Sequence, residues 1–203
     1  MTRKFLDIVY EYIGKGVADF YDDWAATYEA EVAENGYVTP GRCARALARH
    51  LKQPDAPILD FGCGTGLSGL ALRAEGFSTI DGIDLSAEML EQARAKGIYR
   101  TLTQVDGAGP LPVQPGDYQA IAAIGVIGPG AAPLAVFDTL TGLLARGGFM
   151  TFSYNDHALR DPTYEARLNE YVDVGALRLL HREHGPHLPT RNIHAMVYVV
   201  EKT

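Results

Sequence analysis

The segment from Ile58 to Gly69 reads ILDFGCGTGLSG, and it decides how the chain is expected to fold. A short apolar run passes directly into a glycine-rich loop and then into a helical pattern. Glycine suits this loop because a ligand approaches the backbone closely where a strand turns into a helix N-terminus, and a Cβ atom would block that approach. The segment therefore predicts a strand, a ligand-binding turn and a helix.

Short apolar runs and helical patterns alternate after this segment. Such alternation is typical of βαβ units that build a parallel sheet covered by helices on both faces. Ser86 is expected to be the N-cap of the second helix. The strands are expected at residues 57–61, 78–83, 100–104, 118–125 and 149–154, and the helices at about 68–75, 87–96 and 133–146.

The last fifty residues follow a different pattern. Residues 177–181 and 194–200 read as two strands, joined by a loop that contains Gly185, Pro186 and Pro189. A connection without a full crossover helix suits an antiparallel pair of strands. We therefore expect an antiparallel pair at the edge of the parallel sheet.

The length of 203 residues fits one domain with a small appendage. We expect residues 1–52 to form a helical N-terminal lid or cap, and residues 53–203 to form the α/β domain. Cys43 and Cys63 are expected to be reduced thiols, because a chain of this size needs no disulfide. Asp7 and Glu11 interrupt what would be the apolar centre of a secretion signal, so a cytoplasmic location is expected.

The formal net charge of the chain is −7, from 18 basic and 25 acidic residues. This balance predicts no basic surface for a phosphate backbone or an anionic membrane. The uncharged stretch at residues 118–137 is broken by glycine and proline, so it reads as a strand, a turn and a helix rather than a membrane span. We therefore expect a small-molecule partner, and neither nucleic acid nor a membrane.

Three carboxylates follow successive strands. Asp60 precedes the first glycine of the loop, Asp84 ends the next strand, and Asp106 lies near the end of the third. Strand ends in an open α/β sheet face the ligand crevice, so these carboxylates should line one cleft. A carboxylate before the glycine loop favours an ammonium or a sulfonium over a pyrophosphate. The letters from Gly64 to Gly69 also satisfy the dinucleotide fingerprint G-x-G-x-x-G, which keeps a nicotinamide cofactor as an alternative.

Class I S-adenosylmethionine-dependent methyltransferases have successive motifs that four segments of this sequence resemble in the same order: ILDFGCGTG, GIDLSAEML, QVDGAGPLP and LLARGGFMTFS. The resemblance covers about residues 55–154. It implies a Rossmann-like, doubly wound sheet of seven strands, mostly parallel, with an antiparallel C-terminal hairpin. It also implies S-adenosylmethionine as cofactor, S-adenosylhomocysteine as product, and methyl transfer to an oxygen or nitrogen of a small molecule by in-line displacement. A nicotinamide-dependent oxidoreductase and a non-catalytic S-adenosylmethionine-binding module are the alternatives.

The resemblance implies roles for particular residues. Asp84 would hold both ribose hydroxyls, Asp106 would reach the adenine amino group, and the glycine loop would lie beneath the methionine part. The competing interpretation is that Asp81, Asp84 and Asp106 are solvated turn residues. The other residues of the loop and strand ends that are expected to contact the cofactor are Asp60, Phe61, Gly62, Cys63, Gly64, Leu85, Met89, Gly107, Ile124 and Gly125.

An aromatic stripe occurs in the N-terminal segment. Tyr21, Trp24 and Tyr28 have the spacing of one helix face, which a helix packed on the sheet core would explain. The segment YDDWAATYE, followed by GYVTP, also resembles the N-terminal lid of a small-molecule branch that includes methyltransferase-like proteins of the Williams-Beuren region. A tyrosine near a sulfonium would attract it through a cation–π interaction. On this interpretation Tyr21, Tyr28 and Tyr37 contact the cofactor.

The residues after the fifth strand are the candidates for handling the acceptor. A hydroxyl or ammonium acceptor must lose a proton, and Asn155 and His157 follow a strand end that faces the cleft. The competing interpretation makes Asn155 or Asp156 a helix cap. The histidines of HREHGPH, residues 181–187, are not expected to bind a metal, because a strand that passes into a turn would not hold them in one ligating geometry. A substrate-side loop or an exposed turn explains them.

Overall fold

The computed structural model describes residues 4–9, 16–107 and 109–203. It contains one sheet in the order β3-β2-β1-β4-β5-β7-β6, whose first five strands in sequence run parallel while β7 is antiparallel to both β5 and β6. This confirms the predicted Rossmann-like, seven-stranded sheet with an antiparallel C-terminal hairpin. The strands are β1 Ile58–Phe61, β2 Ile80–Asp84, β3 Thr101–Gln104, β4 Ala120–Ala123, β5 Phe149–Asn155, β6 Leu177–Leu188 and β7 Ile193–Lys202.

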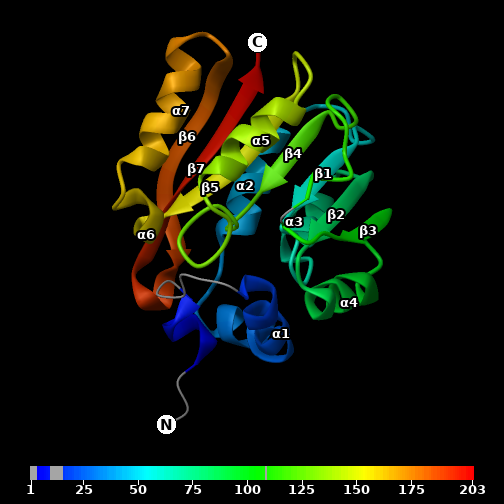
Figure 1. Cartoon of the computed structure of the whole chain (residues 1–203), viewed down its shortest axis with the longest axis vertical. Helices are drawn as coiled ribbons and strands as arrows, with labels where there is room; N and C mark the ends of the chain where they lie inside the picture. The colour runs from blue at the N-terminus through cyan, green and yellow to red at the C-terminus, as the bar shows by residue number, and fades with distance from the viewer. Residues whose placement is uncertain (1–3, 10–15, 108) are drawn as a thin grey trace.

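Helices cover both faces of the sheet, and each face has its own apolar core (Figure 1). Neighbouring residues of β1 enter different cores, since Leu59 packs with α5 to α7 and Ile58 packs with α2 and α3. Successive side chains of a strand point to opposite faces, which explains why these strands read as continuous apolar runs. The helices are η1 Phe5–Asp7, α1 Val17–Glu34, α2 Thr39–Ala48, α3 Leu67–Ala74, α4 Ala87–Ala95, α5 Ala135–Leu143, α6 Asp156–Leu159, α7 Thr163–Asp173 and η3 Pro189–Arg191.

The helix boundaries agree with the capping signals. Ser86 is the N-cap of α4, as predicted, and its hydroxyl accepts a hydrogen bond from the backbone amide of Met89 at 3.0 Å. Gly76 and Gly97, which follow α3 and α4, adopt positive φ angles of 97° and 63°. These are conformations that glycine adopts at a helix C-terminus without steric cost.

The hairpin differs from the prediction, because β6 continues through Gly185 and Pro186 instead of ending in a loop. Arg42 of α2 binds the backbone of this part of the hairpin. Its buried guanidinium donates hydrogen bonds to the backbone carbonyls of Pro186 and Ala195, both at 3.0 Å, and of Glu183 at 2.9 Å. A Cβ atom on Gly185 would lie 2.8 Å from the guanidinium, so glycine serves here to admit Arg42. A contact between segments so distant in sequence could not be inferred from the local pattern.

Helix α1 lies across the carboxyl ends of the parallel strands (Figure 1). The side chain of Ser86 donates a hydrogen bond to Asp22, and Lys96 forms an ion pair with Glu29 at 2.6 Å, so polar contacts fasten α1 to the α4 region. Its apolar residues, including Trp24, form a third cluster with η1, outside both cores of the sheet. In contrast, α2 packs in a sheet core although it falls within residues 1–52. The proposed domain boundary at residue 53 stays a prediction.

No helix in the described ranges has the length and apolar character needed to cross a lipid bilayer. In the region of residues 118–137, the structure has strand β4, a connecting segment and the start of α5. This is the arrangement that the glycine and proline residues predicted.

Candidate active site

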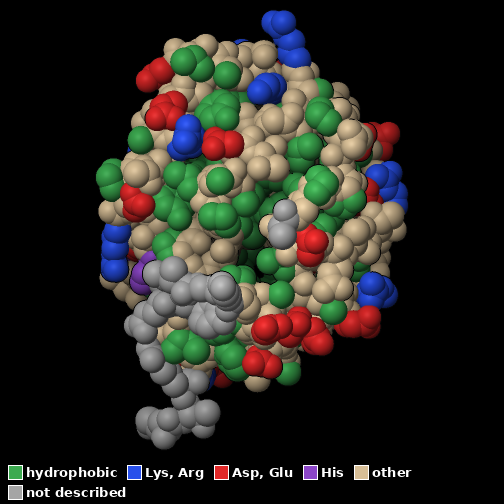
Figure 2. All heavy atoms as spheres, viewed as in Figure 1, with side chains coloured by type: hydrophobic (Ala, Val, Ile, Leu, Met, Phe, Trp, Pro, Cys, Tyr) green, Lys and Arg blue, Asp and Glu red, His purple; other side chains and the backbone are tan. Residues whose placement is uncertain are grey.

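Three adjoining cavities lie where α1 faces the strand ends. The large cavity has a volume of about 340 Å³, the aromatic cavity about 60 Å³ and the loop cavity about 30 Å³. Tyr28 lines all three of them, Gly125 lines the large and aromatic cavities, and Tyr37 lines the aromatic and loop cavities. On the face shown in Figure 2, the surface is hollowed near its centre, with hydrophobic side chains around the hollow. The cavities therefore meet at Tyr28.

The large cavity has the size and character of a small-molecule site, with apolar walls and few polar groups. Asp84 is the one carboxylate among the described residues that line it. Most of the residues expected to contact a cofactor are in its wall: Tyr21, Tyr28, Phe61, Gly62, Gly64, Asp84, Leu85, Met89, Gly107, Ile124 and Gly125.

Asp84 ends β2 and is held by two backbone amides. Its Oδ2 accepts a hydrogen bond from Gly64 at 2.8 Å, and its Oδ1 accepts one from Ser86 at 3.0 Å. Burial raises the pKa of Asp84 above its ordinary value, while these hydrogen bonds oppose the shift because they favour the carboxylate. Each carboxylate oxygen has a further lone pair. Asp84 can therefore accept hydrogen bonds from a ligand while it holds the glycine loop in place.

The glycine loop depends on two different properties of glycine. A Cβ atom on Gly62, which has a φ of 66°, would overlap the side chain of Val126, so close packing excludes a larger residue. Gly64 has a φ of 53°, and a Cβ atom built on it would have no neighbour within 4 Å. At this second position the positive φ requires glycine. Gly64 lines both the large cavity and the loop cavity, so the space beside it is open to a ligand.

Asp60 does not line any of the three cavities, which corrects the prediction that three carboxylates face one cleft. It is fully buried behind the loop, where its Oδ2 accepts hydrogen bonds from the hydroxyls of Ser68 at 2.6 Å and Tyr99 at 2.7 Å. Its Oδ1 has no hydrogen-bond partner among the described residues. Burial, together with the nearby charge of Asp84, raises the pKa of Asp60 to about 6, although its two hydrogen bonds oppose the shift. The side chain points inward because residues alternate between the two faces of β1.

Asp106 is exposed and is likewise absent from the cavity walls, although its neighbours Val105 and Gly107 line the large cavity. Its Oδ1 accepts a hydrogen bond from the backbone amide of Gly109 at 2.8 Å. This is the turn contact that the competing interpretation offered. Its role toward adenine stays a prediction. Cys63 lines the loop cavity, and burial raises the pKa of its thiol well above the ordinary value, consistent with a thiol that is not a nucleophile.

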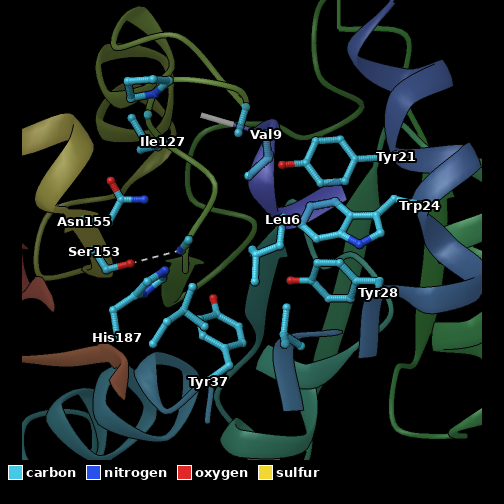
Figure 3. Close-up of a pocket in the computed structure, with 16 residues that line it drawn as sticks. Leu6, Val9, Tyr21, Trp24, Tyr28, Tyr37, Ile127, Ser153, Asn155 and His187 are labelled. Atoms are coloured by element: carbon cyan, nitrogen blue, oxygen red, sulfur yellow. Dashed lines mark hydrogen bonds between the residues drawn. The ribbon is translucent and has the colours of Figure 1, made fainter. Parts of the chain in front are cut away.

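The aromatic cavity lies between two unlike walls. Figure 3 shows Tyr21, Trp24 and Tyr28 from α1 on one side, and on the other side residues from the ends of β5 and β6, among them Asn155 and His187. Ring contacts order the first wall, since Trp24 stacks on Tyr21 with centroids 5.8 Å apart and meets Tyr28 edge-on at 4.9 Å. The aromatic stripe therefore packs within its own cluster and also lines the site.

Asn155 and His157 lie in different environments in the structure, and only Asn155 lines a cavity. Asn155 lines the aromatic cavity and is the N-cap of α6, where its Oδ1 accepts hydrogen bonds from the amides of His157 at 3.1 Å and Ala158 at 3.0 Å. This confirms the capping interpretation. His157 is absent from all three cavity walls, which corrects the expectation that it faces the acceptor. The first turn of α6 directs it elsewhere, and burial lowers its pKa.

His187 is a cavity residue that the sequence did not single out. Its Nδ1 lies 2.8 Å from the hydroxyl oxygen of Thr39, and its ring meets that of Tyr37 edge-on at 5.1 Å. Burial lowers the pKa of His187 to about 4, so the imidazole is neutral near pH 7. Its place at the end of a strand in the histidine-rich segment was the available signal. That signal could not distinguish His187 from His184, which is exposed.

A separate group of side chains lies where α6 meets the hairpin. The Nε2 of His184 is 3.9 Å from the carboxylate of Asp156, and the Nδ1 of His194 is 3.6 Å from it. Candidate ligand atoms of these three residues all lie within 4.8 Å of one another. The two imidazole rings are stacked, with centroids 5.2 Å apart. Of the histidines of HREHGPH, which were not expected to bind a metal, only His184 belongs to this group, because Asp156 and His194 come from outside that segment.

Comparisons with known proteins agree with this architecture. A family model described as "Methyltransferase domain" matches residues 35–197. Human methyltransferase-like protein 27 is 41% identical over 117 residues, which are 56% of this chain and 48% of the relative. The 18S rRNA (guanine(1575)-N(7))-methyltransferase of Saccharomyces cerevisiae is 29% identical over 163 residues, covering 73% of this chain and 59% of the relative. The chain thus spans about half of the length of these relatives.

The crystal structure of magnesium protoporphyrin IX methyltransferase from Synechocystis PCC 6803, with bound S-adenosylmethionine, has the same fold. The TM-score is 0.61 at 18% sequence identity, and the alignment covers 98% of this chain and 90% of the other. At this identity the likeness is evidence of fold only.

The exclusion of nucleic acid as a partner was wrong. The yeast relative is named as an rRNA methyltransferase, and it shares sequence with most of this chain. Net charge is a sum over the whole chain, whereas recognition of one base depends on local shape and charge, so the sign of the sum does not exclude such a partner.

The family match covers more than half of the chain and includes the glycine loop, the end of β2, all of β6 and the first half of β7. It favours the methyltransferase interpretation over the oxidoreductase that the G-x-G-x-x-G spacing had kept as an alternative. The chain belongs to the methyltransferase domain family, and its fold is that of class I S-adenosylmethionine-dependent methyltransferases.

Proposed function

We propose that the protein transfers a methyl group from S-adenosylmethionine to a small-molecule acceptor. The observation that carries the proposal is the position of Asp84. Two backbone amides hold its carboxylate in the wall of a cavity of about 340 Å³, and that cavity meets two smaller ones at Tyr28.

The residues of the large cavity fit the nucleoside part of the cofactor. Each oxygen of Asp84 accepts a backbone hydrogen bond, from Gly64 or Ser86, and a carboxylate oxygen can accept a second one from a ribose hydroxyl. Leu85 and Met89 offer apolar surface for a purine ring, with Met89 almost completely buried. A cavity of this volume is in the usual range for a ligand of this size.

The charges near the loop cavity fit the methionine part. Asp60 lies behind the glycine loop and Asp84 lies beside it, and each is a carboxylate in a buried environment. A positively charged group in the loop cavity would relieve the repulsion between them, whereas a pyrophosphate would add to it. The ammonium and sulfonium groups of the cofactor are positively charged.

S-adenosylmethionine, when bound, would supply a methyl group on a positively charged sulfur. The bond between methyl and sulfur would break as the acceptor's lone pair forms the new bond, and the sulfur would keep the electron pair of the broken bond. The part of this chain is to align the two reactants and to exclude water. Tyr28 is placed for both tasks, since it lines all three cavities. The aromatic rings of Tyr28 and Tyr37 also attract a cation at this junction.

The small-molecule part of the proposal rests on the aromatic cavity. It adjoins the large cavity, has a volume of about 60 Å³, and offers aromatic and neutral polar side chains to whatever enters it. Such a cavity admits a compact group a few atoms long. The yeast relative's name points to an RNA base instead, so both kinds of acceptor belong in the test.

The first experiment is calorimetric titration with S-adenosylmethionine and S-adenosylhomocysteine. Binding of either in the micromolar range supports the proposal, and failure of both to bind at millimolar concentration would overturn it. The second experiment supplies methyl-labelled S-adenosylmethionine with a panel of metabolites and, separately, with an 18S rRNA fragment. Label in a small molecule supports the proposed acceptor class, whereas label only in the RNA contradicts it.

A further inference from the structure

The aromatic cavity carries a second inference, about the chemistry of the acceptor. Its described lining residues include no lysine, arginine, aspartate or glutamate. A charged group that entered would lose its hydration without forming an ion pair with the wall, and this is unfavourable. The cavity therefore favours an acceptor group that is polar but neutral.

Asn155 presents a hydrogen-bond donor to the cavity. Its Oδ1 accepts two backbone hydrogen bonds from the first turn of α6, and this fixes the orientation of the side-chain amide. The Nδ2 atom, which carries two protons, makes no hydrogen bond within the part of the chain that the structure describes. Since Asn155 lines the cavity, an oxygen atom that entered could accept a hydrogen bond from Nδ2.

His187 presents its second ring nitrogen. Its Nδ1 is paired with Thr39 at 2.8 Å, and its backbone carbonyl accepts a hydrogen bond from the amide of Val38 at 3.2 Å. Both contacts come from the start of α2 and hold the ring against Tyr37 in the cavity wall (Figure 3). Nε2 is therefore the nitrogen that remains for a ligand. Burial, which lowers the pKa of His187, keeps the ring neutral and makes a hydrogen-bonding role more suitable than that of a strong base.

We propose that Asn155 and His187 bind a hydroxyl group of a neutral acceptor, whose apolar body lies against the wall formed by Trp24 and Tyr28. A hydroxyl oxygen can accept from Nδ2 of Asn155 and also pair with Nε2 of His187, in whichever tautomer the histidine adopts. An ammonium has no lone pair for Asn155, and a carboxylate, which has no proton to donate, can pair with Nε2 only in the tautomer that protonates it and would enter without a cation to balance its charge. The inference rests on the proposed function, because this cavity joins the one assigned to the cofactor at Tyr28.

Three probes of similar shape test the inference: benzyl alcohol, benzylammonium and benzoate. Each is titrated into the full chain, with and without saturating S-adenosylhomocysteine, while the ring nitrogens of histidine are observed by ¹⁵N NMR. We expect benzyl alcohol to bind at least tenfold more tightly than either ion and to shift the Nε2 resonance of His187. Equal binding of the three probes, or preference for an ion, would overturn the inference.

Two variants test whether Asn155 and His187 cause the preference for the alcohol over the two ions. His187→Phe keeps an aromatic ring but removes Nε2, and Asn155→Asp keeps an oxygen for the helix cap but removes the Nδ2 donor. Each should reduce the preference for the alcohol at least fivefold, while the affinity for S-adenosylhomocysteine stays within twofold. His50→Gln, outside all three cavity walls, serves as the control. If both cavity variants keep the wild-type preference for the alcohol, the inference is wrong. Failure of the wild type to bind S-adenosylhomocysteine would instead contradict the proposed function.

Discussion

The carboxylate of Asp84 at the end of β2 accepts a hydrogen bond from the backbone amide of Gly64, at 2.8 Å. This bond joins the two motifs on which the candidate site depends, the glycine loop and the acid after the second strand. It also means that Asp84 has a structural task in addition to any contact with a ligand. A substitution of Asp84 can therefore change both the conformation of the glycine loop and the affinity for a ligand.

Asp84→Asn should weaken binding of S-adenosylhomocysteine by about 1–3 kcal/mol, because one carboxylate oxygen and the negative charge are lost. The remaining amide oxygen can still accept from one of the two backbone amides, so the loop should keep its shape. Calorimetric titration gives the affinity, and thermal unfolding reports whether the loop is intact. Asp55→Asn, at an exposed position away from the cavities, is the matched control. Equal affinity of Asp84→Asn and wild type would remove Asp84 from the site.

Asp60 should make the folded state less stable as the pH rises. Its pKa is about 6 in the folded state, above the ordinary value near 4, so the folded state binds more protons than the unfolded state between these values. Stability contributed by the neutral carboxyl is then lost as the pH rises from 4 to 6, by about 3 kcal/mol. Denaturant unfolding of wild type and Asp60→Asn at several pH values measures the difference. A difference that does not vary with pH would contradict the raised pKa.

His187 should act in the opposite direction over a similar range. Its pKa is about 4 when folded, below the ordinary value of 6.5, so the unfolded state binds the extra proton between these values. Stability is therefore present above pH 6.5 and is lost as the pH falls toward 4. In His187→Gln this loss should disappear, so that the variant is less sensitive to acid than the wild type. Parallel pH profiles for the two proteins would rule out a buried neutral histidine.

Gly125→Ala should damage the junction of the cavities. The residue has a φ of 70°, and an added Cβ atom would lie 2.5 Å from the hydroxyl of Tyr37. The strained backbone costs about 1–2 kcal/mol, and Tyr37 must also move away. We expect a lower melting temperature and weaker binding of S-adenosylhomocysteine. Gly142→Ala provides the comparison, because a Cβ atom there meets nothing within 4 Å and its φ needs no glycine. Similar behaviour of the two variants would show that the Tyr37 contact is unimportant.

Arg42→Met should destabilise the hairpin. The guanidinium donates to three backbone carbonyls of β6 and β7, and its loss removes this donor from the buried carbonyl of Ala195 and from the partly buried carbonyls of Glu183 and Pro186. We expect a loss of about 3 kcal/mol or more of unfolding free energy. Arg178→Met, which removes an exposed ion pair on the same hairpin, should cost less than 1 kcal/mol. Chemical denaturation of both variants checks the contrast.

The local sequence determined the order of strands and helices, the parallel sheet and its hairpin, and the position of the glycine loop. These features follow from the period of apolar residues, from capping residues such as Ser86, and from glycine at turns, all of which act over a few residues. Asp84 was recognisable for the same reason, because a residue at the end of a parallel strand lies at the ligand edge of the sheet.

Only the tertiary structure decided which side chains enter the cavities. Asp60 follows the same pattern as Asp84 but turns behind the loop, His157 turns away with α6, and His187 reaches the aromatic cavity because Thr39 holds its ring. Local sequence fixes the position of a residue along its strand or helix. The direction of its side chain in space depends on packing partners that are distant in sequence, as Arg42 and the hairpin also demonstrate.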